Sequence, residues 1–439
     1  MAIERMKNPF EQDQKCRFCS SKKVIKIIDF GEVGLAGGFL LPEDFGIEKK
    51  FLQQLYFCED CFLLQIINKI DPKLLFKDYF YFSSAISTLR KHFRSYAEEI
   101  TKEFLIPETS TVLEIGCNDG ILLKPFIELG VKKVIGVDPS TNVISTIKDP
   151  DIIIYNNFLT QDLSEKIIEE HGQVDLICAN NVFAHINDMK DVTWAIKGLL
   201  KPSGVFIFEV HYIGSLIEEV QYDMIYHEHI YYYSLLTLKK FFSEFSLEIF
   251  NIKPIPIHGG SMRYYIRHTG KLENKKISLK LINLEKQELE KGYDKKTTFL
   301  TYAKEVKSTK LNLMSLLKEL KMKKMSIVGY GASGRANTLI QYCGINQSIL
   351  DYIIDDAPMK HGYFTPGSHL KIFSRDILKQ NKPDYILIFA WSFFNEIIEK
   401  NIKYLHEGVK FIIPLPKVKI VSFNSGSIVE EIYEKHQGV

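Results

Sequence analysis

The sequence has few of the features that mark secreted, membrane or nucleic-acid-binding proteins. Its net charge is only +2 over 439 residues, and lysines alternate with acidic residues, so no basic stripe is present for nucleic acid. The N-terminal segment MAIERMKNPFEQDQKC lacks the apolar core of a signal peptide. The longest apolar runs, such as YILIFAW, are too short to cross a bilayer. We therefore expect a cytoplasmic enzyme that binds neither nucleic acid nor membrane.

Cysteine is also scarce: there are seven, an odd number, which argues against a disulfide framework in a reducing compartment. Four of them form two CxxC motifs, the arrangement in which zinc closes a structural cage of four thiolates. The expected metal ligands are Cys16, Cys19, Cys58 and Cys61. A redox dithiol or chance spacing are the alternatives, and the other three cysteines are interpreted as small core residues.

The chain is expected to form a small cysteine-bearing module and two α/β domains. We assign residues 1–75 to a zinc-binding module and 76–270 to a domain in which strands and helices alternate, as in a parallel sheet covered on both faces. Residues 271–322 have helical spacing and are expected to form a helical connection. A second Rossmann-like βα series then fills 323–439. The strands expected in the middle domain are Thr111–Ile115, Lys133–Asp138, Ile152–Tyr155, Val174–Ala179 and Gly204–Val210.

The stretch VLEIGCNDG (Val112–Gly120) is a hydrophobic strand that ends in a glycine-containing turn before a helical segment. Gly116 and Gly120 would let the backbone pass close to a ligand at the carboxyl end of the strand. Dinucleotide dehydrogenases use a similar loop, but this one lacks the GxGxxG spacing. Its polar side chains are Glu114, Asn118 and Asp119. These acceptors suit a cationic amino acid and a sulfonium, and they would repel a pyrophosphate, so the loop predicts S-adenosyl-L-methionine binding.

Polar residues also follow the next strands of the series. Asp138 ends the second strand, where a carboxylate can accept both ribose hydroxyls. Asn157 and Phe158 follow the third strand and could contact adenine. After the fourth strand come Asn180, Asn181 and His185. Each alone could be a turn or capping residue, but their order and spacing together predict a methyl-donor site.

The densest polar and aromatic cluster is YDMIYHEHIYYYS, from Tyr222 to Ser234. Within it, Tyr226, Glu228 and His229 offer a phenol, a carboxylate and an imidazole. Histidine supplies a neutral base near physiological pH, a carboxylate can orient it, and a phenol can stabilise an enolate oxygen. A HxH metal site and a polar helix start are the alternatives for this segment.

Two further motifs carry candidate residues. In IHGGSMRYY, Arg263 follows Gly259-Gly260 and would be available to a phosphate, although a structural turn explains the motif equally well. In DYFYFSS, Tyr79 and Tyr81 precede an expected amphipathic helix.

The chain resembles the nucleotide-sugar C-methyltransferases, which include the C-3'-methyltransferases that act on dTDP-4-keto-deoxysugars. The resemblance covers nearly the whole length. Its motifs are the paired CxxC, YFSS followed by Arg90-x-His92, EIGCNDG, NNVFAH, YHEH, HGGSMR, GYGASGR, DDAPMKHGYFTPG and FAWSFFNEI. The resemblance implies that a base removes the proton beside the 4-keto group and that the enediolate attacks the donor methyl.

The resemblance also implies residue roles. The base falls on His229, with Glu228, Tyr226, His185 and one of Tyr79 or Tyr81 lining the sugar site. It further implies structural zinc and a nucleotide sugar, dTDP- or GDP-linked, held between the middle and C-terminal domains. The sequence indicates no oligomeric state, and a monomer is the default.

The C-terminal motif GYGASGR follows an expected strand and opens a helix, so its amides could bind a pyrophosphate. The candidate substrate residues are Gly331, Ser333, Gly334 and Arg335. The family usually has lysine where Arg335 stands, and arginine keeps the charge but changes its geometry. Without the resemblance, this domain looks like a Rossmann NAD site in which Asp355-Asp356 would bind ribose, but a glycine-rich match alone is weak.

Two other hypotheses remain open at this point. One is methylation of oxygen or nitrogen on a nucleotide sugar or another small molecule, which would need no strong carbon-acid base. The other is a binding or scaffold protein without catalysis, against which the joint presence of Tyr226, Glu228, His229 and His185 argues.

Overall fold

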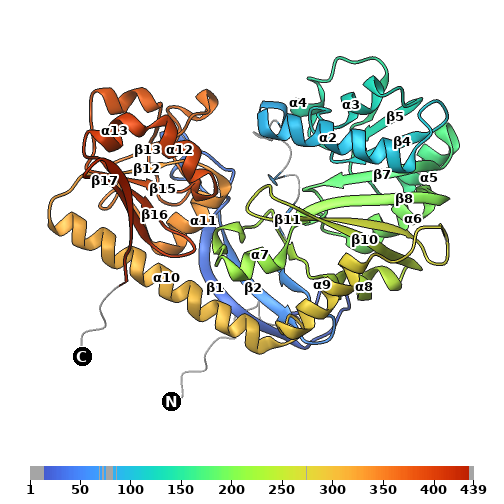
Figure 1. Cartoon of the computed structure of the whole chain (residues 1–439), viewed down its shortest axis with the longest axis horizontal. Coiled ribbons are helices and arrows are strands. Elements are labelled where there is room, and N and C mark those ends of the chain that lie inside the picture. Colours follow the sequence, from blue (N-terminus) through green and yellow to red (C-terminus); the bar gives the residue numbers. More distant parts are fainter. Residues whose placement is uncertain are drawn as a thin grey trace. The chain divides into compact units, whose positions relative to one another are not determined.

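A computed structural model describes residues 14–68, 70–71, 74–75, 83–85, 87–272 and 274–434. Its chain divides into two compact units (Figure 1). Unit 1 comprises the described residues of Met1–Ile25, Phe57–Ile213 and Ile230–Lys295, and unit 2 comprises Lys26–Tyr56, Gly214–His229 and those of Lys296–Val439. Each unit is thus assembled from three separate stretches of chain. No helix among the described residues is long and apolar enough to cross a membrane.

Unit 1 is built on a seven-stranded sheet with the order β10-β11-β8-β7-β4-β5-β6. Its strands are β4 (Thr111–Ile115), β5 (Lys133–Val137), β6 (Ile152–Tyr155), β7 (Val174–Asn180), β8 (Leu200–His211), β10 (Leu247–Ile255) and β11 (Ser261–His268). The strands β4 to β8 are parallel and lie where the sequence predicts strands. The hairpin β10–β11 adds two antiparallel strands next to β8, so the sheet is mixed.

The helices of unit 1 pack on this sheet through apolar faces. In α2 (Ser87–Phe104), Leu89, Phe93, Tyr96 and Ile100 recur at helical spacing and are buried in the main core. Side chains cap several of the helices: Thr160 accepts from Leu163 N, and Asp188 accepts from Asp191 N. The other helical elements are η3 (Ser83–Ala85), α3 (Leu123–Glu128), α4 (Thr141–Ile144), α5 (Gln161–His171), α6 (Met189–Leu199), α8 (Leu235–Ser243) and α9 (Leu279–Glu290).

The cysteine-bearing part contributes short strands to both units. In unit 1, β3 (Leu64–Ile66) pairs antiparallel with β9 (Tyr231–Tyr232). The strands β1 (Val24–Gly34) and β2 (Lys50–Cys58) lie mostly in unit 2, as does the 3-10 turn η2 (Pro42–Asp44).

Unit 2 is built on a second seven-stranded sheet with the order β14-β13-β12-β15-β16-β17-β18. Its strands are β12 (Ile327–Tyr330), β13 (Ile353–Ile354), β14 (Ile372–Phe373), β15 (Tyr385–Ile388), β16 (Lys410–Ile413), β17 (Lys419–Asn424) and β18 (Ser427–Ile432). From β14 to β16 the pairing is parallel, as expected for a Rossmann-like series, and β17 and β18 are antiparallel.

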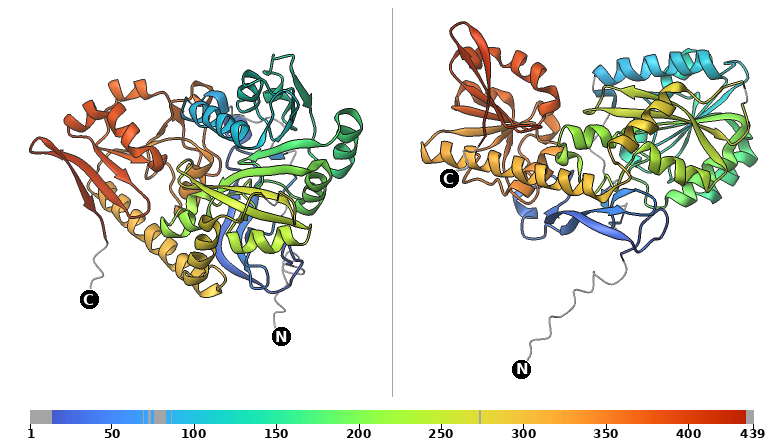
Figure 2. Two further views of the ribbon diagram at one scale, coloured as in Figure 1. Left: turned by 45° about the vertical axis from the view of Figure 1, so that its right-hand side comes forward. Right: turned by 60° about the horizontal axis from the view of Figure 1, so that its bottom comes forward.

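Helix α11 follows β12 directly and starts at a defined cap. The Ser333 side chain accepts from Ala336 N, and the helix ends at Gly344, whose φ of 70° lies in the left-handed region. The long helix α10 (Lys296–Met322) is continuous in both views of Figure 2, and with α9 it accounts for most of the stretch 271–322 where helical spacing was predicted. The other helical elements are α7 (Ile213–Glu218), η4 (Tyr222–Met224), α10 (Lys296–Met322), α11 (Gly334–Cys343), η5 (Pro358–Lys360), η6 (Arg375–Lys379), η7 (Trp391–Phe393), α12 (Phe394–Lys400) and α13 (Ile402–His406).

Candidate active site

The glycine loop after β4 is shaped by a close approach of two backbones. Gly116 has a φ of 68°, and a Cβ added there would lie 2.2 Å from Val182 Cγ2, so only glycine fits this turn. Asn118 also has a positive φ, and its Oδ1 accepts from Ser83 N at 3.0 Å. Gly120, with a φ of 77°, closes the turn by donating to Cys117 O. The loop is therefore a tight turn at the carboxyl end of β4, formed by three residues with positive φ.

Buried acceptor atoms collect beside this loop. Asn180 Nδ2 donates to Glu114 Oε1 at 3.4 Å, and Ser84 N donates to Asp119 Oδ2 at 3.0 Å. Glu114 Oε2, Asp119 Oδ1 and Asn180 Oδ1 are buried and have no hydrogen-bond partner among the described residues. Unpaired buried acceptors are costly, so the arrangement fits a ligand that donates hydrogen bonds, such as an ammonium group. Burial, with Asp138 and Asp119 nearby, raises the pKa of Glu114 to about 8.

Asp138 ends the second parallel strand in the same unit. Its Oδ2 accepts from Asn118 N at 3.0 Å and its Oδ1 from Ser140 N at 2.8 Å, which fixes the carboxylate and leaves each oxygen a further lone pair. Burial raises the pKa of Asp138. Asn157 and Phe158 follow β6 and are exposed, as a residue pair that contacts an adenine would be before binding.

After β7, Asn181 has a positive φ and donates its N–H to Glu209 O at 2.8 Å. His185 N donates to Val182 O, in the turn that packs on Gly116. Burial lowers the pKa of His185 to about 4, so its ring is neutral at physiological pH.

The histidine of the YHEH segment is held at both ring nitrogens within unit 2. His229 Nδ1 lies 3.1 Å from Met224 O, and because a carbonyl can only accept, Nδ1 carries the proton. The Tyr226 hydroxyl lies 2.8 Å from Nε2, and the two ring centres are 4.1 Å apart. In the neutral ring Nε2 is therefore the acceptor nitrogen, to which the hydroxyl donates. Burial raises the pKa of Glu228, the preceding residue, to about 7.

The glycine loop of the C-terminal sheet lies against this segment. A Cβ added at Gly334 would lie 3.6 Å from the Tyr226 ring, so the start of α11 contacts the tyrosine that binds His229. At Gly331, where φ is 97°, a Cβ would lie 2.9 Å from Ala390 Cβ. The base segment and the GYGASGR loop thus belong to one compact unit, although the sequence analysis placed them in different domains.

The guanidinium of Arg335 forms an ion pair with the buried carboxylate of Asp223. Its Nε donates to Asp223 Oδ2 at 2.8 Å, and Trp391 Nε1 donates to the same oxygen at 2.9 Å. Arg335 Nη2 has no hydrogen-bond partner among the described residues and is the group left for a ligand. Ser333 Oγ, by contrast, is already used to cap α11.

The two aspartates that an NAD ribose would require are hydrogen-bonded within unit 2. Asp355 accepts from Ala332 N at 2.7 Å and from Ala357 N at 2.8 Å. Asp356 accepts from the Tyr330 hydroxyl at 2.8 Å. Asp355 thus accepts one backbone N–H bond on each oxygen, as Asp138 does in unit 1, so these bonds alone do not argue against the NAD interpretation.

The expectation that Arg263 is available to a phosphate needs correction. Arg263 lies inside β11 and its side chain is 2% exposed. Its guanidinium binds Glu209 at 2.6 Å and Glu99 at 3.2 Å, so it is a buried ion-pair residue. Tyr79 and Tyr81, the other candidates for the sugar site, lie outside the described residues.

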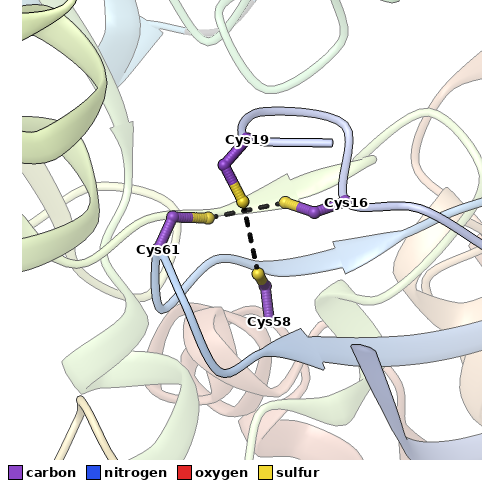
Figure 3. A group of neighbouring side chains, drawn as sticks. All are labelled: Cys16, Cys19, Cys58 and Cys61. Carbon is purple, nitrogen blue, oxygen red and sulfur yellow. Dashed lines mark hydrogen bonds between the residues drawn. The ribbon is translucent and has the colours of Figure 1, made fainter. Parts of the chain in front are cut away.

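The four cysteines of the CxxC motifs converge in unit 1, and Figure 3 shows their sulfur atoms pointing toward one another. All four Sγ atoms lie within 4.8 Å of one another. The Sγ pairs Cys16–Cys61 and Cys19–Cys58 are 3.4 and 3.6 Å apart, far longer than a disulfide. Four thiols at this spacing fit a tetrahedral zinc ion with no open position.

Three family models match successive parts of the chain: a zinc binding domain over residues 16–76, a methyltransferase domain over 89–251 and a C-methyltransferase C-terminal domain over 256–416. The chain is 28% identical to the C-methyltransferase NovU of Streptomyces niveus over 412 residues, which cover 94% of this chain and 97% of that protein. These matches, in this order along the chain, support a C-methyltransferase related to NovU.

Other similarities of this C-methyltransferase are confined to part of its length. It is 30% identical to a ubiquinone biosynthesis O-methyltransferase of Rhodopseudomonas palustris over 25% of this chain and 43% of that protein. The PH0226 protein of Pyrococcus horikoshii, a solved structure, aligns with 46% of this chain and all of its own at 12% identity and a TM-score of 0.34. The C-methyltransferase uses S-adenosyl-L-methionine, and its cysteine cluster is a structural zinc site.

Sequence reasoning missed the buried ion pairs of both units. Glu209 and its partners His92 and Arg263, and Asp223 with its partner Arg335, come from distant parts of the chain. The motif Arg90-x-His92 pointed to His92 only as part of the family resemblance and indicated no function for its side chain.

Proposed function

We propose that this C-methyltransferase adds a methyl group to the carbon beside the keto group of a nucleotide-linked 4-keto-deoxysugar. The observation that carries the proposal is the pairing of an oriented imidazole with the glycine loop of the C-terminal sheet. Both ring nitrogens of His229 are held, and Tyr226, which binds Nε2, lies against Gly334 at the start of α11. A loop amide and Arg335 Nη2 are suited to the diphosphate.

In the proposed reaction, His229 Nε2 takes the proton from the sugar carbon, and the electron pair of the broken C–H bond forms an enediolate. S-adenosyl-L-methionine supplies an electrophilic methyl group when bound. The sugar carbon forms a bond to that methyl as the sulfonium bond breaks, which leaves S-adenosylhomocysteine. The Tyr226 hydroxyl, displaced from Nε2 by the substrate, is suited to stabilise the enolate oxygen.

The proposal is tested with S-adenosyl-L-methionine and a panel of 4-keto nucleotide sugars, followed by mass spectrometry for the gain of one methyl group. We expect His229→Ala to lower kcat by roughly 10²- to 10⁴-fold and to abolish exchange of the sugar C–H with deuterated water. His406→Ala is the matched control, because that exposed histidine of unit 2 only packs on Phe423.

Two outcomes would contradict this function. Methylation of an oxygen or nitrogen with only a modest effect of His229→Ala would replace it with heteroatom methylation. Failure with every 4-keto sugar, although S-adenosyl-L-methionine binds, would exclude the substrate class.

A further inference from the structure

A buried carboxylate–histidine pair lies in unit 1. His92 Nε2 is 2.8 Å from Glu209 Oε2, and the side chains are 14% and 0% exposed. Because a carboxylate oxygen accepts, the imidazole donates from Nε2, and the opposite ring nitrogen, Nδ1, is left for a ligand.

The carboxylate of this pair is fixed from its other side. Arg263 holds Glu209 Oε1 at 2.6 Å, and its guanidinium lies 3.9 Å from the centre of the Tyr96 ring. Burial alone would raise the pKa of Glu209, but the hydrogen bond with His92 and the charge of Arg263 lower it below its ordinary value. Glu209 is therefore an anion that orients the His92 ring by accepting from Nε2–H.

His92 lies between two parts of the methyl-donor site. On one side, Glu209 is the register partner of Asn180, whose amide contacts Glu114. On the other side, the turn that leads into α2 donates its Ser83 and Ser84 amides to Asn118 and Asp119 of the glycine loop. The helix that carries His92 is thus anchored on that loop.

The acidic residues beside the glycine loop suit the ammonium group of the cofactor, but they provide no cation for its carboxylate. The amino-acid end of S-adenosyl-L-methionine carries an ammonium group and a carboxylate. Glu114 and Asp119 offer unpaired acceptor atoms that suit the ammonium group, and both would repel the carboxylate. A cationic donor is needed there, and His92 Nδ1–H provides one.

We infer that His92, held by Glu209 and Arg263, binds the carboxylate of the cofactor's methionine moiety. The ring then carries protons on both nitrogens, with Nε2–H donating to Glu209 and Nδ1–H to the cofactor; the second proton comes from solvent. The inference goes beyond the proposed function, because it concerns the cofactor and holds for any methyl acceptor.

The test compares S-adenosyl-L-methionine with its decarboxylated analogue, which keeps the ammonium and sulfonium groups. Binding to the full zinc-loaded chain is measured by isothermal titration calorimetry, without a methyl acceptor. We expect the wild-type protein to bind S-adenosyl-L-methionine roughly ten- to hundredfold more tightly than the analogue, the range of a charge-assisted hydrogen bond. His92→Gln should remove this preference by weakening the binding of S-adenosyl-L-methionine alone.

Glutamine is chosen because its amide can still donate to Glu209 from the Nε2 position while nothing replaces Nδ1. Arg94→Gln is the matched control, since Arg94 is an exposed cation on the same helix that pairs with Glu98. It should leave the preference unchanged. Equal weakening of both ligands by His92→Gln, an unaltered preference, or loss of the preference in Arg94→Gln would each overturn the inference.

A spectroscopic measurement keeps the test valid if His92→Gln does not fold. In wild-type protein with ¹⁵N-labelled histidine, one ring should become doubly protonated on addition of S-adenosyl-L-methionine and not on addition of the decarboxylated analogue. The same response to both ligands, or to neither, would also overturn the inference.

Discussion

At the scale of single residues, the proposed methyl-donor site contains a buried carboxyl group, Glu114, whose ionisation costs free energy. Glu114 is buried, one of its oxygens lacks a partner among the described residues, and its pKa is raised from 4.5 to about 8. Since its pKa is higher in the folded than in the unfolded state, its contribution to stability is present below the unfolded pKa and is lost as the pH rises toward 8. At neutral pH the carboxyl of Glu114 is therefore mainly protonated, and a bound cation would favour its ionised form.

The raised pKa of Glu114 predicts a pH dependence of cofactor binding. A cationic ligand favours the ionised carboxylate, so below pH 8 binding must release the Glu114 proton. In the His92→Gln variant, where no imidazole takes up a proton on binding, we expect the affinity for S-adenosyl-L-methionine to rise with pH, by up to about tenfold per unit, and to level off near pH 8. Glu114→Gln should flatten this profile in calorimetric titrations, whereas Glu128→Gln, which alters an exposed side chain, should not. An unchanged slope in Glu114→Gln would show that another group titrates.

At the scale of elements, the turn between β4 and α3 depends on the close approach of Gly116 to Val182. The left-handed φ and the 2.2 Å contact that a Cβ would make act together at this one position. The turn after β7 therefore limits which residue can stand in the turn after β4.

We expect Gly116→Ala to lower the free energy of unfolding by roughly 1–3 kcal/mol, from backbone strain and overpacking. Adding Val182→Ala removes the methyl groups that clash and should recover part of the loss, while the φ strain remains. Urea denaturation of the two single variants and the double variant measures this coupling. If the losses in the free energy of unfolding were strictly additive, Gly116 and Val182 would not be in energetically significant steric contact.

At the scale of the whole molecule, neither unit is a continuous piece of chain. Unit 2 uses Lys26–Tyr56 and Gly214–His229 in addition to the C-terminal stretch. Its helix α11 is held by these segments: Gln341 accepts from Gly34 N at 2.8 Å, and Asn337 donates to Ala36 O. The carboxylate of Glu48 likewise accepts from Gly367 N and binds His369 at 2.9 Å.

This interleaving predicts the behaviour of a fragment. Residues 323–439, the C-terminal domain expected from the sequence, should not fold cooperatively alone, because α11 would expose Ala336, Leu339 and Ile340 and lose its partners. Thermal melting by circular dichroism and the dispersion of amide NMR signals measure this, with the full-length chain as the control. A fragment with a sharp transition and dispersed signals would contradict the expectation and favour the linear division.

Much of the architecture follows from local patterns. The strands β4 to β8 lie at the expected positions because buried parallel strands are short apolar runs between helical segments. The CxxC spacing alone predicts the four-sulfur cluster, since each pair is confined to one tight turn. The hairpin β10–β11 was not predicted, because its edge position depends on pairing with β8.

The sequence by itself determined the methyl-donor loop, the metal ligands and the order of the two α/β sheets, all of which are encoded within short windows. The tertiary structure alone decided the partners of the buried charges. Glu209 pairs with His92 across 117 residues and with Arg263 across 54, and Asp223 pairs with Arg335 across 112. A buried charge is stable only next to its partner, and that partner is chosen by the packing of distant segments, which no local periodicity records. For this reason Arg263 looked like a phosphate ligand in the sequence and is an internal ion-pair residue in the fold.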